Sequence, residues 1–207
     1  MTPMSGLLLD ALPFPPCRIP IILASKSPRR IELMQQAGLQ FTVCVAGEVD
    51  EIYPTELQRD EIPLYLANLK ADAFLQAYDI DTEIVVAADT IVWHNGQVLG
   101  KPVDRNDAIR MLQQLSGSVH DVFTGVCLAT RSGRHLFSDD TKVFFRELSI
   151  QEINHYVDGY QPYDKAGAYG IQEWIGLVGI EKIIGSYFNV VGLPIQKLYS
   201  EIHKFIS

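Results

Sequence analysis

Residues 19–38, IPIILASKSPRRIELMQQAG, join an apolar run to a helix-like segment through a short cationic stretch. The run at 19–24 is typical of a short buried strand, and residues 28–37 have the spacing of a helix that ends before Gly38. Ser27 is the expected N-cap, followed by a proline at the first helical position. A strand that passes directly into a helix is the first half of an α/β unit, so this stretch indicates the fold class.

Strands and helices continue to alternate along the chain, although hairpins interrupt the alternation. The predicted strands are 39–46, 83–100 (with a break at Asp89 and a hairpin turn at 94–96), and an antiparallel pair, 119–130 and 135–148. The predicted helices are 62–78, 104–117 with Asp104 as N-cap, 149–159 with a Ser149–Glu152 capping box, and one from Pro194 onward. We therefore predict an α/β (α+β) fold with a mixed twisted sheet flanked by helices, as one two-lobed domain at 18–207 after an N-terminal extension at 1–17.

The composition supports one globular core and excludes several classes of protein. Of the 207 residues, 47% are hydrophobic and 20% are charged, which is enough apolar material for a folded domain. The formal net charge of −8 argues against a protein that coats nucleic acid or an anionic membrane, so an anionic ligand requires a local cluster of cations. No apolar run approaches the ~20 residues of a membrane span. The separated cysteines favour reduced thiols in a cytoplasmic protein over a disulfide framework or a zinc site: Cys17, Cys44 and Cys127.

The cationic stretch between the first strand and the first helix has the composition of an anion site. A helix N-terminus presents unpaired N–H groups and a partial positive charge. The nearby side chains add hydroxyl and guanidinium donors suited to phosphate oxygens: Ser25, Ser27, Arg29 and Arg30. The alternative is an ordinary helix start with solvated arginines. Each cation there opposes the helix dipole by roughly 0.3 kcal/mol or more, so two adjacent arginines favour a phosphate ligand.

Carboxylates follow the second predicted strand and interrupt the third. Asp89 comes after the apolar run 84–88, a usual place for a metal ligand or a general base in an open α/β sheet. A turn or N-cap aspartate is the alternative. Glu48, Asp50 and Glu51 form an acidic loop, which would hold Mg²⁺ or Mn²⁺ against a phosphate or remain solvated.

Two lysines and a glycine-rich segment are further candidates. Lys70 is the single cation of the helix at 62–78, and Lys101 follows the hairpin toward the same end of the sheet. Each would bind phosphate or extend into solvent. The segment 162–172, PYDKAGAYGIQ, contains tight turns and ends at Gln172, whose amide both donates and accepts hydrogen bonds at a base edge. The alternative is a structural turn.

Six motifs occur in order along the chain: ASKSPRRIELMQQAGLQFTV (24–43), AADTIV (87–92), LGKP (99–102), MLQQLSGSVHDVFTGV (111–126), DKAGAYGIQ (164–172) and GSYFNVVGLP (185–194). At this spacing, they resemble the motifs of the Maf family of nucleoside triphosphate pyrophosphatases. The match extends from about Ile21 to the last helix. It implies a Maf/ITPase-like, two-lobed architecture with a central cleft.

The resemblance implies hydrolysis of a nucleoside triphosphate between its α- and β-phosphates, giving the monophosphate and pyrophosphate. It implies Asp89 as general base, Lys101 as a second catalytic residue, and a divalent cation, Mg²⁺ or Mn²⁺, at Glu51 and Asp89. The implied substrate-binding residues are Ser25, Ser27, Arg29, Arg30, Lys70, Thr90, Lys165 and Gln172. A cytoplasmic house-cleaning enzyme follows, with a small nucleotide as substrate, no nucleic-acid or membrane partner, and homodimer formation.

The motif at 164–172 resembles the branch of the family that acts on dTTP and UTP. Its specificity positions map onto Arg29, Thr90 and Gln172. The departures from the family pattern beside these positions are Lys26, Glu173 and Trp174.

Two other functions stay open at this point. One is a non-catalytic, nucleotide-sensing regulator of cell division and septum formation, which would need the cations but not the base. The retained Asp89, Glu51 and Lys101 argue against it. The other is a pyrophosphatase for 7-methyl-GTP or other noncanonical nucleotides.

Overall fold

The computed structural model describes residues 19–47 and 49–205. The predicted extension at 1–17, with Cys17, and Glu48 of the acidic loop lie outside the described residues. The elements in chain order are β1 (Ile21–Leu23), α1 (Pro28–Gln36), β2 (Phe41–Val43), α2 (Glu61–Ala77), β3 (Ile84–His94), β4 (Gln97–Leu99), α3 (Arg105–Leu115), β5 (Val119–Ala129), β6 (Arg134–Phe145), α4 (Ile150–Tyr160), the 3₁₀ helix η1 (Ala166–Ala168), α5 (Trp174–Gly179), β7 (Ile180–Ile184), α6 (Tyr187–Val191) and α7 (Ile195–Phe205).

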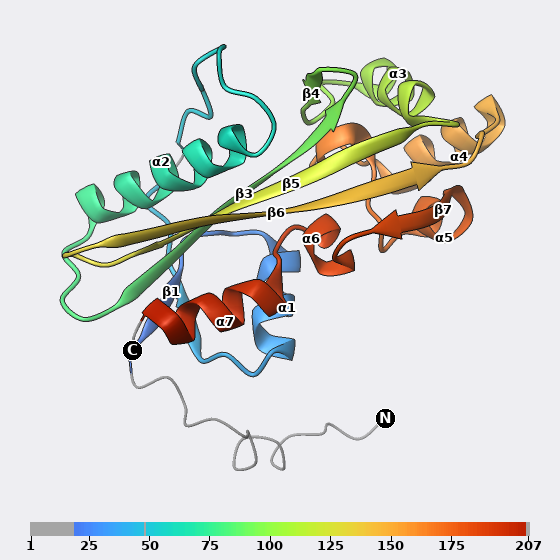
Figure 1. Cartoon of the computed structure of the whole chain (residues 1–207). Helices are drawn as coiled ribbons and strands as arrows, with labels where there is room; N and C mark the ends of the chain where they lie inside the picture. The colour runs from blue at the N-terminus through green and yellow to red at the C-terminus, as the bar shows by residue number, and fades with distance from the viewer. Residues whose placement is uncertain (1–18, 48, 206–207) are drawn as a thin grey trace.

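The described strands form one seven-stranded mixed sheet, as predicted. Its order is β2-β1-β3-β5-β6-β7, and β4 pairs with β3 outside this path. β1 runs parallel to β2 and β3, whereas the other pairs are antiparallel. The long strands β3, β5 and β6 cross the whole molecule (Figure 1). The sheet therefore joins a parallel α/β beginning to an antiparallel remainder.

Helices cover both faces of the sheet. α2 lies on one face of the long strands, and α1, α6 and α7 lie on the other (Figure 1). Alternate side chains of β3 pack against the helices on the two faces of the sheet, because successive side chains of a strand point to opposite faces. Ala87 packs in a cluster with Ala71 and Phe74 of α2. Ala88 belongs to the larger core on the other face, with Met34 of α1.

The predicted break at Asp89 was wrong, because β3 runs without interruption from Ile84 to His94. Its pairing with β5 is continuous, and Asp89 lies opposite Gly125. The discontinuity is in the neighbouring strand instead: β1 ends at Leu23, and β4 begins to pair with β3 only at Val92. The edge of β3 is therefore open at the level of Asp89.

Gly125 explains how α2 comes to lie over Asp89. A Cβ at this position would lie 2.3 Å from the Pro63 carbonyl carbon and 2.4 Å from the Leu64 nitrogen. Any side chain would displace the first turn of α2, so the glycine permits direct contact between the helix backbone and β5. That contact brings the polar side chains of α2 over the central part of β3.

The helix caps that the sequence predicts are present. Asp104 accepts from the Asp107 N–H at the start of α3, and Ser149 and Glu152 form a capping box at the start of α4. Ser27 occupies the N-cap of α1 without a side-chain cap bond. The glycine-rich region 167–192, in contrast, contains α5, β7 and α6, which the sequence analysis did not predict. Elements of five or six residues are too short to show periodicity.

The described residues bear on two expectations from the sequence, the state of the cysteines and the lack of a membrane span. Cys44 and Cys127 are free thiols. Within 19–47 and 49–205, no helix is both long enough and apolar enough to cross a membrane.

His120 is a buried polar group whose protonation opposes the fold. It lies in β5 with 2% of its surface exposed, and its Nε2 is 2.7 Å from the Tyr169 hydroxyl. Its Nδ1 has no hydrogen-bond partner. Burial, with a smaller contribution from His94, lowers the pKa of His120 to about 3.

We predict that His120 makes the fold less stable in acid. Because its folded pKa is below the unfolded value of about 6.5, the unfolded chain takes up the proton first, and stability falls as the pH drops below 6.5. Between pH 7 and pH 5 the expected loss is about 2 kcal/mol. Urea unfolding of the wild-type protein and of His120→Gln at both pH values measures it. The exposed His155→Gln should keep the wild-type loss; an equal loss in His120→Gln would contradict the prediction.

Candidate active site

A cleft of about 1130 Å³ lies beside the open edge of β3. Its walls come from the β1–α1 connection, the loop after β2, α2, the end of β4, residues 164–173 and residues 190–192. Because β1 stops before β3 does, side chains from both faces of the sheet reach this space. All of the predicted site residues line it: Ser25, Ser27, Arg29, Arg30, Glu51, Lys70, Asp89, Thr90, Lys101, Lys165 and Gln172.

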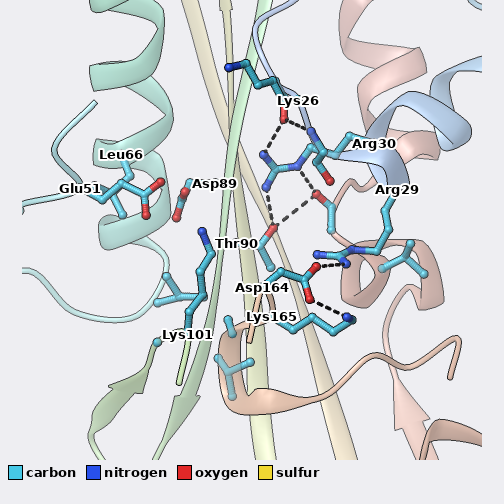
Figure 2. Close-up of a pocket in the computed structure, with 18 of the residues that line it drawn as sticks. Lys26, Arg29, Arg30, Glu51, Leu66, Asp89, Thr90, Lys101, Asp164 and Lys165 are labelled. Atoms are coloured by element: carbon cyan, nitrogen blue, oxygen red, sulfur yellow. Dashed lines mark hydrogen bonds and ion pairs between the residues drawn. The ribbon is translucent and has the colours of Figure 1, made fainter. Parts of the chain in front are cut away.

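Lys70 joins the two predicted metal-binding carboxylates. Its Nζ is 2.5 Å from Asp89 Oδ1 and 2.7 Å from Glu51 Oε1. Lys101 lies in the loop after β4, and its ammonium points toward these carboxylates (Figure 2). Residues from α2, β3, the acidic loop and the end of the hairpin therefore converge at one point.

The two carboxylates differ in their affinity for protons. Asp89 is 7% exposed, and burial raises its pKa, although the charges of Lys70 and Arg30 act against the increase. Burial also acts to raise the pKa of Glu51, but the hydrogen bond and charge of Lys70 outweigh it and the pKa is lowered. Glu51 is thus the more firmly ionised group, and Asp89 is the better proton acceptor.

Arg30 is bound to the protein rather than extended into the cleft. Its guanidinium donates to the carbonyl of Ala88 at 2.7 Å, to the carbonyl of Gly192 at 2.8 Å and to the hydroxyl of Thr90 at 3.2 Å. The Ala88 carbonyl lies on the edge of β3 just past the point where β1 ends, after Ala24 N–H has bonded to Val86 O. Arg30 therefore satisfies a backbone carbonyl at the open edge of β3 and a second one after α6.

Thr90 belongs to a buried polar network on the face of β3 opposite Asp89. Its hydroxyl contacts that of Thr124 at 3.0 Å and the carbonyl of Gly192 at 3.3 Å. Thr124 in turn donates to the backbone carbonyl of Asn189, in α6. Asn189 and Gly192 lie in the motif at 185–194, for which the sequence predicted no role. The structure shows that it holds Arg30 and Thr90 in place.

On the wall formed by the start of α1 and residues 164–173, cations and carboxylates alternate. Arg29 Nη1 is 3.0 Å from Asp164, which also accepts from Lys165 Nζ at 2.6 Å. Lys165 binds Glu173 as well, at 3.1 Å. Figure 2 shows the Arg29–Asp164–Lys165 contacts below Arg30. No local sequence pattern pointed to the role of Asp164 or to the pairing of Glu173 with Lys165, because these partners are brought together only by the fold.

The remaining candidates lie at the rim or support it. Ser25 Oγ accepts from the Ser27 N–H at 3.2 Å, inside the β1–α1 connection. Gln172 is exposed at the edge of the cleft. Lys26 also lines the cleft, but its ammonium points away from the guanidinium of Arg30 (Figure 2). The Gly167 N–H donates to the Gly100 carbonyl at 3.0 Å and ties this wall to Lys101.

The carboxylate pair suits a hard divalent cation that is shared with a ligand. Glu51 and Asp89 already contact one positive charge, the ammonium of Lys70. In the part of the chain that the structure describes, no group of three or more His, Cys, Asp or Glu side chains converges. Mg²⁺ and similar ions are commonly held by one or two carboxylates, with water and phosphate oxygens completing the shell, so these residues fit such an ion.

The fold and the cleft define an α/β protein with a buried carboxylate next to several cations. A family model described as Maf-like protein matches residues 20–205, so the chain belongs to the Maf family, as the sequence motifs indicated. It is 57% identical over 185 residues to a dTTP/UTP pyrophosphatase of Bacteroides fragilis, covering 89% of this chain and 95% of that protein.

Relatives from other species bear the same name. A dTTP/UTP pyrophosphatase of Bacteroides thetaiotaomicron is 53% identical over 184 residues, covering 89% of this chain and 95% of that protein. One from Flavobacterium psychrophilum is 51% identical over 179 residues, covering 86% of this chain and 91% of that protein.

We predict that the two adjacent arginines contribute differently to stability. Arg30→Lys removes the guanidinium that donates to the carbonyls of Ala88 and Gly192 and to two hydroxyls, and an ammonium cannot reach all of these acceptors at once. Each lost hydrogen bond costs about 1 kcal/mol, so unfolding should become easier by roughly 2 kcal/mol. Arg29→Lys affects a partly exposed ion pair and should change stability by less than about 1 kcal/mol. Urea denaturation of both variants tests the difference. Equal effects would show that Arg30 does not support the edge of β3.

Proposed function

We propose that this protein hydrolyses dTTP and UTP between the α- and β-phosphates, as part of nucleotide-pool house-cleaning. The observation that carries the proposal is the buried Asp89, held by Lys70 beside Glu51 in a cleft that also contains Arg29 and Lys101. The relatives named dTTP/UTP pyrophosphatase, which match nine-tenths of the chain, support this choice of substrate.

The cations of the cleft would offset the charge of the triphosphate. Lys70 of α2, Arg29 of α1 and Lys101 of the loop after β4 line one space. The N-terminus of α1 adds unpaired N–H groups to the same wall. Fixed cations of this kind stabilise charge on transferring phosphoryl groups without reorganisation during the reaction.

Asp89 would act as the general base. It would accept a proton from the attacking water as the water oxygen bonds to phosphorus and the bridging phosphorus–oxygen bond breaks, which leaves the monophosphate and pyrophosphate. Its raised pKa supports this role, because a more basic carboxylate is a better proton acceptor. Lys70 would hold the carboxylate in position and keep it ionised between turnovers.

Glu51 and Asp89 would hold a divalent cation, Mg²⁺ or Mn²⁺, when substrate is bound. The ion would supply charge neutralisation on phosphate oxygens. The cytoplasmic location, the homodimer and the lack of a nucleic-acid partner that the sequence suggested stay predictions.

We predict that the wild-type protein releases pyrophosphate from dTTP and UTP and that Asp89→Asn loses this activity. A panel that adds 5-methyl-UTP, pseudo-UTP, CTP and 7-methyl-GTP, assayed with Mg²⁺ and with Mn²⁺, measures both. Loss of the base should lower kcat by ~10²–10⁴-fold, whereas the exposed Asp81→Asn should retain full activity.

The same panel separates the alternatives. Binding of nucleotides without pyrophosphate release would favour the non-catalytic sensor. Hydrolysis of 7-methyl-GTP alone would show that the substrate is this nucleotide and not dTTP or UTP. If Asp89→Asn hydrolyses UTP at the wild-type rate, Asp89 is not the general base.

We also predict that activity requires a divalent cation and that Glu51 helps to hold it. EDTA should abolish pyrophosphate release, and added Mn²⁺ or Mg²⁺ should restore it. In Glu51→Gln, loss of one carboxylate ligand should raise the half-saturating metal concentration about tenfold or more. Glu56→Gln, in the same loop but outside the cleft, is the matched control. An unchanged metal dependence in Glu51→Gln would exclude Glu51 as a ligand.

A further inference from the structure

A tight turn that presents Gln172 to the cleft is held at both ends by one hydroxyl. The Glu173 N–H donates to the Gly170 carbonyl at 3.0 Å, which places Gln172 in the centre of the turn. The Tyr156 hydroxyl accepts from the Gly170 N–H at 3.0 Å and donates to a carboxylate oxygen of Glu173. The first and last residues of the turn are thus fastened to the same point of α4.

The Tyr156 side chain is itself held in place by the core. Tyr156 has none of its surface exposed and lies in the main core beside Ile153 and Val157. The other central residue of the turn, Ile171, is 8% exposed and packs in the same core, whereas Gln172 is exposed. The direction of the Gln172 side chain therefore depends on how the turn is fixed to the core.

Glu173 also fixes the nearest lysine. Its second carboxylate oxygen is 3.1 Å from Lys165 Nζ, whose side chain is only 11% exposed. Both side chains pack directly on Gly170, where a Cβ would lie 2.9 Å from the Glu173 carboxyl carbon and 3.1 Å from the Lys165 Cε. One carboxylate thus connects the turn, the lysine and the core.

We propose that Tyr156 and Glu173 are positioning residues that set the selectivity of this protein for the nucleobase. The proposal rests on the proposed function and extends it to Tyr156, which is fully buried, and to Glu173, whose carboxylate is bound by that tyrosine and by Lys165. The pair holds the backbone on both sides of Gln172, and the ammonium of Lys165, in one arrangement before the nucleotide arrives, so that less binding energy is spent on ordering them.

The chemistry of the bases makes this arrangement selective. Uracil and thymine present a carbonyl acceptor and an N–H donor on the pairing edge, and cytosine presents an amino donor and a nitrogen acceptor. An amide fixed in one orientation matches one of these patterns, whereas an amide that rotates freely matches both. A loosened turn should therefore lower discrimination between UTP and CTP more than it lowers turnover.

The test is Tyr156→Phe, which keeps the buried ring and removes only the hydroxyl. We expect KM for UTP to rise and the ratio of kcat/KM for UTP to that for CTP to fall, each about tenfold, with kcat for UTP within about twofold of wild type. Tyr160→Phe, one turn further along α4 on an exposed tyrosine, should change neither value. Unchanged KM and selectivity in a folded Tyr156→Phe protein would overturn the proposal.

Glu173 provides an independent variant and a coupling measurement. Glu173→Ala should reduce selectivity as Tyr156→Phe does, and the double variant should lose little more than either alone, because both remove the same contact. Glu173→Gln keeps an acceptor for the tyrosine hydroxyl and should recover part of the selectivity. Additive losses, or no recovery by glutamine, would indicate a general loss of stability instead.

A binding experiment separates this proposal from the proposed function. The dissociation constants of α,β-methylene-UTP and α,β-methylene-CTP should differ in the wild-type protein and converge in Tyr156→Phe. If the wild-type protein releases no pyrophosphate but shows this convergence, the proposed reaction fails and the positioning role holds. If the protein hydrolyses UTP and the two constants do not converge, the positioning role fails alone.

Discussion

The cleft depends on one feature of the sheet, the end of β1 at Leu23 beside a strand that continues to His94. The exposed edge of β3 would leave backbone groups without partners, and Arg30 satisfies the Ala88 carbonyl there while it also binds the Gly192 carbonyl after α6. The same guanidinium joins α1 to Gly192 after α6. The start of α1, the edge of β3 and residues 190–192 of the cleft wall are therefore held together. The space beside this edge is where the reactive side chains meet.

Charge is arranged in this cleft by pairing. The chain has a formal net charge of −8, yet four cations that line the space have defined carboxylate or carbonyl partners: Arg29, Arg30, Lys70 and Lys165. Lys70 is placed between Asp89 and Glu51, and Asp164 between Arg29 and Lys165. Paired groups are less costly to desolvate than isolated ones, so a cleft can keep ionised side chains in fixed positions before an anion binds.

Much of the fold follows from local patterns. The strand–helix start, the antiparallel pair β5–β6 and the caps at Asp104 and Ser149 depend on residues close together in the sequence, and the structure confirms them. Two features were not predictable in this way. The apparent break at Asp89 is a charged residue inside a regular strand, tolerated because Lys70 from α2 neutralises it. The short elements after residue 166 take their form from packing against the sheet rather than from their own periodicity.

The sequence by itself determined the family, the mixed α/β fold and the residues that gather in the cleft, because each motif carries its own chemistry in a few consecutive positions. The tertiary structure alone decided what those residues do for one another. Arg29 and Arg30 are identical neighbours in the sequence, but one faces an exposed aspartate and the other supports a strand edge. Tyr156 and Glu173 gave no indication of joint action until folding brought α4 against the 170–173 turn. Hydrogen-bond partners more than ten residues apart are chosen by geometry, which a linear pattern does not contain.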